Sequence, residues 1–277
     1  MKIVFFLNSS WSIYNFRKNL IKKLIKNGHE IIVLSSKDQS TIKLKNIGCS
    51  FFEIKIRNNQ INIFNDLVLI FKIKKILKKI KPDFIFNFTI KPLIYGTFIA
   101  GLLDIKTVNM MTGLGTIFIK KNYLTLVVII LYRISFINVY RVIFQNIDDK
   151  KLFNKLKIVN KKNSILSPGS GVDLNFFKFK KNIFKKKTKF LFLGRLLKEK
   201  GTLEFIKVVK KFDKLKLNCE FQIIGDIDIK NPASITVNEL NSFKKLKNSK
   251  YKNFNSDVKR YIGWANCVVL PSYREGT

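Results

Sequence analysis

Short apolar runs alternate along this chain with longer segments whose apolar residues recur every three or four positions. Residues 3–7 form the first run, helical spacing through Leu20, Leu24 and Ile25 ends at Gly28, and residues 30–34 form the next run. A short apolar run predicts a buried strand, and a spacing of three or four predicts an amphipathic helix. The N-terminus therefore predicts a βαβ unit, whose ligands are expected beyond the carboxyl end of the first strand.

The same alternation continues up to about residue 167. The elements expected there are strands at residues 49–54, 84–88, 107–110 and 141–145, and helices at residues 66–80, 92–103 and 123–136. Together these elements predict one parallel, doubly wound domain over residues 1–167. Residues 168–187 have little hydrophobic period and end in a basic run, which is typical of a linker.

A second series of strands and helices begins at residues 190–193. It continues with strands at 220–224 and 267–270 and a helix around 257–263. A Rossmann-like half needs a helix after the last strand and at least one more strand–helix pair, so on the order of 100 further residues are expected beyond Thr277. The predicted fold class is α/β, with two Rossmann-like parallel-sheet domains, the second incomplete at residues 188–277.

The turn between the strand at 190–193 and the following helix carries positive charge. Gly194 lets the backbone approach a ligand closely, the Arg195 guanidinium can form two parallel hydrogen bonds to phosphate, and Lys200 adds a movable point charge. A helix N-terminus behind this turn would favour a diphosphate ligand. The alternative is a solvated basic turn in a lysine-rich chain.

The net charge of +35 over 277 residues invites nucleic acid, an anionic membrane surface or a phosphorylated substrate as partner. Only seven of the 53 basic residues are arginine, and Ile, Asn and Phe are abundant, which suggests AT-rich codon usage. Functional charge is therefore sought at the few arginines and at lysines inside motifs. Basic and aromatic residues do not form a stacking platform, which argues against a nucleic-acid partner.

Other features of the sequence restrict the chemistry and the compartment. Three widely spaced cysteines predict neither disulfides nor a zinc site, and a reduced compartment is expected. His29 is the only histidine and follows a helix-ending glycine, so a structural role is expected. The N-terminus does not resemble a signal peptide.

Two apolar helical segments leave a membrane role open. Residues 123–136 are too short to span a bilayer, and they predict either a buried helix or a helix lying in the membrane interface. Residues 71–80 predict a basic amphipathic helix that either rests on anionic lipid or is an ordinary surface helix with a buried stripe.

Several motifs together resemble the family 4 glycosyltransferases of the GT-B fold. The resemblance is to the bacterial branch that adds sugars to lipid-linked oligosaccharides for capsule, O-antigen or protein glycosylation. The matching stretches are residues 11–17, 88–96, 112–115, 168–173, 194–195 with 200–201, and 270–277. Each is weak alone, but their order and spacing make the resemblance specific, and they extend through the whole chain.

The resemblance implies that the second domain binds a nucleotide sugar, usually UDP-linked. Arg195 and Lys200 would hold its diphosphate and stabilise the departing nucleotide. Glu275 matches the first glutamate of the family's Glu-x7-Glu motif and would contact the donor sugar, whereas the second glutamate would lie beyond Thr277. The expected donor-binding residues are Gly169, Ser170, Gly194, Arg195, Lys200 and Glu275. The expected catalytic residues are Arg195, Lys200 and Glu275.

The first domain would face a lipid-linked acceptor. Arg17 and Lys91 are placed at expected helix starts and could bind the phosphates of a polyprenyl-diphosphate, although Lys91 could equally be a solvated surface residue. Thr112 and Gly113 belong to an expected acceptor-side loop or, alternatively, a plain tight turn. The resemblance also implies retention of anomeric configuration by front-face attack, without a metal cofactor.

The acidic pair Asp226 and Asp228 has the spacing of a metal-binding motif found in a different glycosyltransferase fold. It follows Gly225 where this family carries a similar loop, so no metal role is expected.

The predicted function is a retaining glycosyltransferase, cytoplasmic and peripheral at the inner face of the cell membrane. The alternatives are an inactive fragment and a non-enzymatic basic protein that binds nucleic acid or anionic membrane, for which steep salt-dependent DNA binding is expected.

Overall fold

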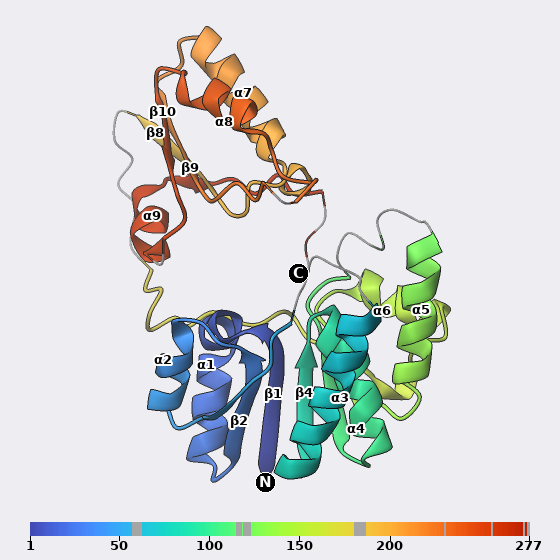
Figure 1. The fold of residues 1–277 in the computed structure, drawn as a ribbon. Coiled ribbons are helices and arrows are strands. Elements are labelled where there is room, and N and C mark those ends of the chain that lie inside the picture. The colour runs from blue at the N-terminus through green and yellow to red at the C-terminus, as the bar shows by residue number, and fades with distance from the viewer. Residues whose placement is uncertain are drawn as a thin grey trace. The chain divides into compact units, whose positions relative to one another are not determined.

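The computed structural model describes residues 1–56, 63–114, 118, 123–179, 187–229, 231–255, 257–273 and 275. Contacts divide them into two compact units, Met1–Gly171 and Val172–Glu275, and each unit is built on one parallel sheet (Figure 1). The division after Gly171 lies inside the expected linker. Gly115, residues 180–186 and residues 276–277, which belong to the motifs and the linker discussed above, lie outside the described residues.

Unit 1 contains a seven-stranded parallel sheet in the order β3-β2-β1-β4-β5-β6-β7. Its first half comprises β1 (Lys2–Ser9), α1 (Ser10–Lys26), β2 (Glu30–Ser36), α2 (Ser40–Asn46), β3 (Ser50–Glu53), α3 (Ile63–Ile80) and β4 (Phe84–Phe88). Its second half comprises η1 (Pro92–Gly96), α4 (Thr97–Leu102), β5 (Lys106–Met111), α5 (Tyr123–Ser135), β6 (Arg141–Phe144), α6 (Ile147–Lys155), η3 (Lys161–Asn163) and β7 (Ser164–Leu166). After β3 the chain returns to pair β4 with β1, so the direction of strand addition reverses between these two strands.

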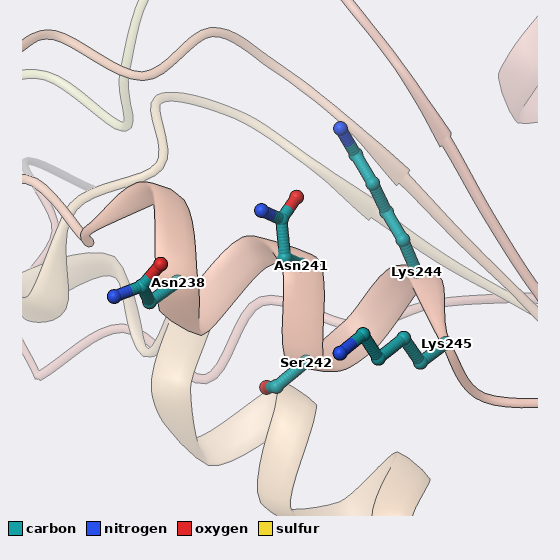
Figure 2. Close-up of a pocket in the computed structure, with 5 residues that line it drawn as sticks. All are labelled: Asn238, Asn241, Ser242, Lys244 and Lys245. Carbon is teal, nitrogen blue, oxygen red and sulfur yellow. The ribbon is translucent and has the colours of Figure 1, made fainter.

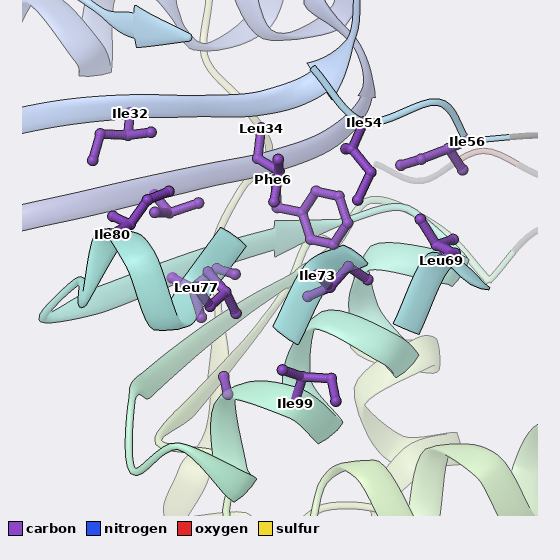
Figure 3. Packing of buried hydrophobic residues seen from close by; sticks show 13 residues of the cluster. Phe6, Ile32, Leu34, Ile54, Ile56, Leu69, Ile73, Leu77, Ile80 and Ile99 are labelled. Atoms are coloured by element: carbon purple, nitrogen blue, oxygen red, sulfur yellow. The ribbon is translucent and has the colours of Figure 1, made fainter. Parts of the chain in front are cut away.

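Both faces of the unit 1 sheet are covered along β1, which explains why this strand reads as an unbroken apolar run. Phe5 packs in a cluster with residues of α1, whereas Phe6 packs on the opposite face. Figure 3 shows this second face, where a stripe of α3 lies against β1, β2 and α4. The buried residues of that stripe are Leu69, Ile73, Leu77 and Ile80. The expected buried stripe is therefore present, and the opposite, lysine-bearing face of the helix is exposed.

Unit 2 carries a four-stranded parallel sheet in the order β10-β9-β8-β11. Its elements are β8 (Thr188–Leu193), η4 (Lys198–Lys200), α7 (Thr202–Lys214), β9 (Cys219–Ile224), α8 (Val237–Lys244), β10 (Ser249–Lys252), α9 (Val258–Trp264) and β11 (Cys267–Val268). Helix α7 packs Phe205, Ile206 and Val209 onto the sheet beside Phe192 and Phe221. The strand–turn–helix expected around Gly194 is therefore confirmed as β8, η4 and α7.

One expected helix differs in its internal geometry. Residues 92–103 were expected to form a continuous α-helix, but they begin as the π-helix η1 before α4. Gly96 lies so close to the sheet that an added Cβ would stand 2.5 Å from Asn87 Oδ1 and 2.9 Å from the Phe6 ring. The wider turn of the π-helix lies where the backbone meets the sheet most closely, as is common near functional sites.

Candidate functional site

The basic turn of unit 2 leaves the carboxyl end of β8 and is fastened to the segment after β9. The Ile235 amide donates to the Leu196 carbonyl at 2.9 Å, and the Lys198 amide donates to the Ala233 carbonyl at 2.8 Å. These hydrogen bonds fix the middle of the turn. The backbone from which Arg195 projects is thus held by its neighbours rather than by the arginine itself.

Two glycines at this edge are required by close packing. Gly225 lies against Gly194, and a Cβ at position 225 would overlap the Gly194 carbonyl oxygen. Gly201 has a left-handed backbone with φ +72°, and a Cβ there would overlap the carbonyl oxygen of Pro271. Gly194, which was expected to let the backbone approach a ligand closely, has no protein atom within 4 Å of an added Cβ. Space beside its backbone is therefore open.

Lys200 and Glu275 meet although 75 residues separate them in the sequence. The Lys200 ammonium lies 2.7 Å from both carboxylate oxygens of Glu275. Partial burial would raise the pKa of Glu275, but the hydrogen bond and charge of Lys200, with the charge of Arg195, lower the pKa below its ordinary value. The structure thus brings together Arg195, Lys200 and Glu275, and the carboxylate is ionised at neutral pH.

Tyr273 helps to hold the segment that carries Glu275 against the turn. Its backbone amide donates to the Glu199 carbonyl at 3.0 Å, and its hydroxyl donates to the Glu204 carboxylate at 2.8 Å. Tyr273 was not among the expected site residues, although it lies inside the motif at residues 270–277.

The N-terminus of α7 completes the anion-binding character of this edge. The helix begins after Gly201, which has no side chain to cap it, and the Thr202 hydroxyl donates to the Leu197 carbonyl at 3.0 Å instead of capping the helix. The first N–H groups of a helix lack partners within the helix and carry partial positive charge. With Arg195 and Lys200 alongside, this edge can bind a diphosphate.

The expected acceptor residues lie in unit 1. Lys91 forms an ion pair with Asp66 at 2.6 Å, and both side chains are largely buried, so this lysine is not a freely solvated surface residue. Thr112 follows β5 and is exposed, and Gly113 has a left-handed φ of +127°. Arg17 does not lie at a helix start as expected: α1 begins at Ser10, so Arg17 is about two turns inside the helix, where its side chain is buried.

Gly169 and Ser170 also belong to unit 1. Gly169 has a left-handed φ of +105°, and the Ser170 hydroxyl accepts a hydrogen bond of 2.9 Å from the side-chain Nε2 of Gln145. Gln145 directly follows β6, so the donor-binding role expected for this pair concerns a loop at the carboxyl edge of the unit 1 sheet.

Two further features of unit 2 do not add to this site. Asp226 accepts a hydrogen bond of 3.1 Å from the Phe254 amide, and within the described ranges no group of three or more His, Cys, Asp or Glu could hold a metal ion. A pocket lies beside α8 (Figure 2), and none of the turn residues lines it. Its lining residues are Asn238, Asn241, Ser242, Lys244 and Lys245.

Comparisons with known proteins match nearly the whole chain. The family model described as "Glycosyl transferase 4-like" matches residues 2–146, and that of "Glycosyl transferases group 1" matches residues 173–277. The N,N'-diacetylbacillosaminyl-diphospho-undecaprenol alpha-1,3-N-acetylgalactosaminyltransferase of Campylobacter jejuni is 28% identical over 295 residues. That alignment covers 100% of this chain and 76% of the relative.

Solved structures show the same fold at low sequence identity. The Anabaena protein HepE in complex with UDP-glucose has a TM-score of 0.72 at 14% identity, covering 100% of this chain and 75% of that chain. Sucrose-phosphate synthase from Thermosynechococcus elongatus has a TM-score of 0.73 at 12% identity, covering 100% of this chain and 77% of that chain. The expected pair of Rossmann-like domains is confirmed.

Proposed function

Because this chain belongs to the glycosyl transferase 4-like family, we propose that it moves a sugar from a UDP-linked donor to a lipid-linked saccharide acceptor. The GT-B fold and the glycosyltransferase assignment expected from the sequence are both confirmed. The Campylobacter relative is named for transfer to a diphospho-undecaprenol-linked sugar. That name supports an acceptor of the same chemical class for this chain.

The observation that carries the proposal is the meeting of Arg195, Lys200 and Glu275 beside the N-terminus of α7. Departure of a nucleoside diphosphate leaves negative charge on its phosphate oxygens, and fixed positive groups stabilise that charge as it develops. Arg195 and Lys200 would supply these positive groups without a metal ion. Glu275 would contact the donor sugar and positions Lys200 through their ion pair.

We infer that the reaction retains anomeric configuration through attack on the same face from which the nucleotide departs. The bond between the anomeric carbon and the phosphate oxygen breaks as the acceptor hydroxyl forms the new bond. The departing phosphate takes the hydroxyl proton. Arg195 and Lys200 would hold that phosphate in place, which keeps the proton acceptor close to the attacking oxygen.

The proposal is tested by titrating the protein with UDP-glucose, UDP-galactose, UDP-GlcNAc and UDP-GalNAc and following its melting temperature. A donor that binds at 100 times its Kd stabilises the folded state by about 2.7 kcal/mol. We expect one of these donors to raise the melting temperature and to label a synthetic prenyl-diphospho-saccharide. A folded protein that responds to none of them would contradict the proposed function.

We also propose that unit 1 docks on an anionic membrane through α5 and the first half of α3. Helix α5 is not the buried helix that was one of its two expected forms. It buries Val128 and Tyr132 but exposes a second apolar stripe, in which Tyr123 is 73% exposed and Leu126 is 64% exposed. Phe64 of α3 is 81% exposed. Both helices contact η1 and α4, and Figure 1 shows them on the same side of the unit.

The charges beside this apolar surface favour anionic lipid. Exposed lysines follow the apolar half of α3, at positions 72, 75, 78 and 79, while its first-turn acid, Asp66, is buried and paired with Lys91. An apolar stripe flanked by lysines matches the interfacial region of an anionic bilayer. No helix within the described residues is long and apolar enough to cross a membrane.

Substituting Tyr123, Leu126 and Ile130 together by serine is expected to abolish co-sedimentation with phosphatidylglycerol vesicles. The reason is loss of the exposed apolar stripe, while UDP-sugar binding in unit 2 stays unchanged. Val208→Ser on the exposed face of α7 is the matched control and should sediment like the parent protein. Equal sedimentation of the triple variant and the parent would refute membrane docking by α5.

A further inference from the structure

We propose that Arg17 is a phosphate-binding residue that receives the diphosphate of the lipid-linked acceptor at the carboxyl edge of the unit 1 sheet. The inference rests on the proposed function for the identity of the ligand. All residues that form the site belong to unit 1.

Arg17 lies where an open α/β sheet forms its ligand crevice. It belongs to α1, the helix that follows β1, and helical side chains lean toward the helix N-terminus, which here begins at the carboxyl end of β1. The Arg17 Cζ atom stands 4.8 Å from the ring centroid of Phe88, the last residue of β4. Strands β1 and β4 flank the reversal of strand order, and such reversals are where α/β sheets bind ligands.

The guanidinium of Arg17 has little to satisfy it. The side chain is only 5% exposed, its Nη1 donates to the Phe16 carbonyl at a long 3.5 Å, and its Nε is buried without an acceptor. Among the described residues it forms no ion pair. Burial lowers the pKa of Arg17 to about 10, so the group still carries its charge at neutral pH.

A buried, unpaired cation is expensive to keep, since its lost hydration is not replaced by an opposite charge. A phosphate oxyanion would supply that charge and an acceptor for Nε. The guanidinium suits it because its N–H groups, which point outward in the plane of the group, can bind two oxygens in parallel while Phe88 lies over that plane. The acceptor of the proposed reaction brings a diphosphate.

The backbone beside Arg17 is held in a strained form. Thr89, directly after Phe88, has φ +62°, which is rare for a β-branched residue. Its hydroxyl donates to Asn8 Oδ1 at 2.9 Å and so ties the end of β4 to the end of β1. Strain of this kind persists where the surroundings enforce it, and it is concentrated at ligand sites.

The test compares Arg17→Met with its parent, both carrying Arg195→Ala and Lys200→Ala to remove the donor turn. The probes are inorganic diphosphate, farnesyl diphosphate and, as the lipid without a phosphate, farnesol. We expect farnesyl diphosphate to raise the melting temperature of the parent and its Kd to weaken at least about tenfold in Arg17→Met, because a charge-assisted hydrogen bond is lost. Farnesol should bind both proteins alike.

The melting temperature without ligand separates a binding role from a structural one. Methionine keeps much of the apolar volume and removes an unpaired charge, so Arg17→Met should melt no lower than its parent. Arg17→Lys keeps the charge but not the two parallel N–H groups, so its diphosphate affinity should lie between those of Arg17→Met and the parent. If Arg17→Met melts lower and binds diphosphate as the parent does, the arginine is structural and the proposal fails.

Arg141→Met is the matched control. Arg141 also lies over an aromatic ring in unit 1, with its Cζ atom 4.6 Å from the Tyr140 centroid, but it begins β6 and so lies at the amino edge of the sheet. Its replacement should leave diphosphate affinity unchanged, and an equal loss would overturn the assignment to Arg17. The UDP-sugar titration reports on the proposed function alone, so Arg17-dependent diphosphate binding without any UDP-sugar binding would leave this site standing and refute the donor.

Discussion

Replacing Arg195 by alanine is expected to slow sugar transfer by about 10²- to 10³-fold, the usual cost of losing one preorganised donor to a developing oxyanion. The Lys200 ammonium is already shared with both carboxylate oxygens of Glu275. Arg195 is exposed, and within the described part of the chain it has no ion pair, so it is the cation best able to follow the phosphate as charge develops. The measurement is the single-turnover rate at saturating donor.

Arg195→Lys distinguishes charge from geometry. A lysine restores the positive charge but not the two parallel hydrogen bonds, so its transfer rate should lie between those of alanine and arginine. The matched control is Arg260→Ala, an exposed arginine of α9 in the same unit, which should transfer at the parent rate. A fully active Arg195→Ala protein would remove Arg195 from the mechanism and, with it, the assignment of the turn as the donor site.

Strong periodicity allowed most of the fold to be predicted. Strand β4 was expected at its observed bounds and β9 within one residue, because central parallel strands are apolar on both faces. Short peripheral elements were missed. Strand β10 has the sequence Ser-Lys-Tyr-Lys and offers no apolar run, and its pairing with β9 is set by the tertiary structure.

Helix α8 was missed although its start was visible in the sequence. Thr236 accepts from the Glu239 amide, and the Glu239 carboxylate accepts from the Thr236 amide, which together form a capping box. That pattern is local and could have been found. The π-helix at residues 92–96, which replaces the first turn of the expected helix, could not be found in this way, because it depends on the close approach of Gly96 to Asn87 and Phe6.

In the candidate site, too, local patterns could be predicted from the sequence, whereas contacts set by tertiary packing could not. Arg195 and Lys200 were identified because they occupy one turn between a strand and a helix. The pairing of Lys200 with Glu275 spans 75 residues, and only the resemblance to a family suggested that the two residues share a site. The burial of Arg17 and the ion pair of Lys91 with Asp66 depend on packing, so no sequence pattern revealed them.

Gly201→Ala is expected to disrupt the donor site by displacing the segment that carries Glu275. An alanine in the left-handed conformation costs about 1–2 kcal/mol. Its Cβ would also overlap the carbonyl oxygen of Pro271, and such overpacking costs about 1–3 kcal/mol more. The overlap is with the Pro271 backbone, which cannot rotate away as a side chain could. Its relief should therefore shift the segment after Pro271 and move Glu275 away from Lys200. UDP-sugar affinity should fall together with the free energy of unfolding of unit 2.

The two tryptophans allow the effect to be assigned to a unit, since Trp11 lies in unit 1 and Trp264 in unit 2. In a Trp11→Phe background, urea unfolding followed by Trp264 fluorescence should shift to lower urea for Gly201→Ala. Gly263→Ala is the matched control, because Gly263 lies within helix α9 and no atom lies within 4 Å of an added Cβ. That variant should be stabilised by up to about 1 kcal/mol. If both alanine variants unfolded at the same urea concentration, the contact between Gly201 and Pro271 would not be what holds Glu275 beside Lys200.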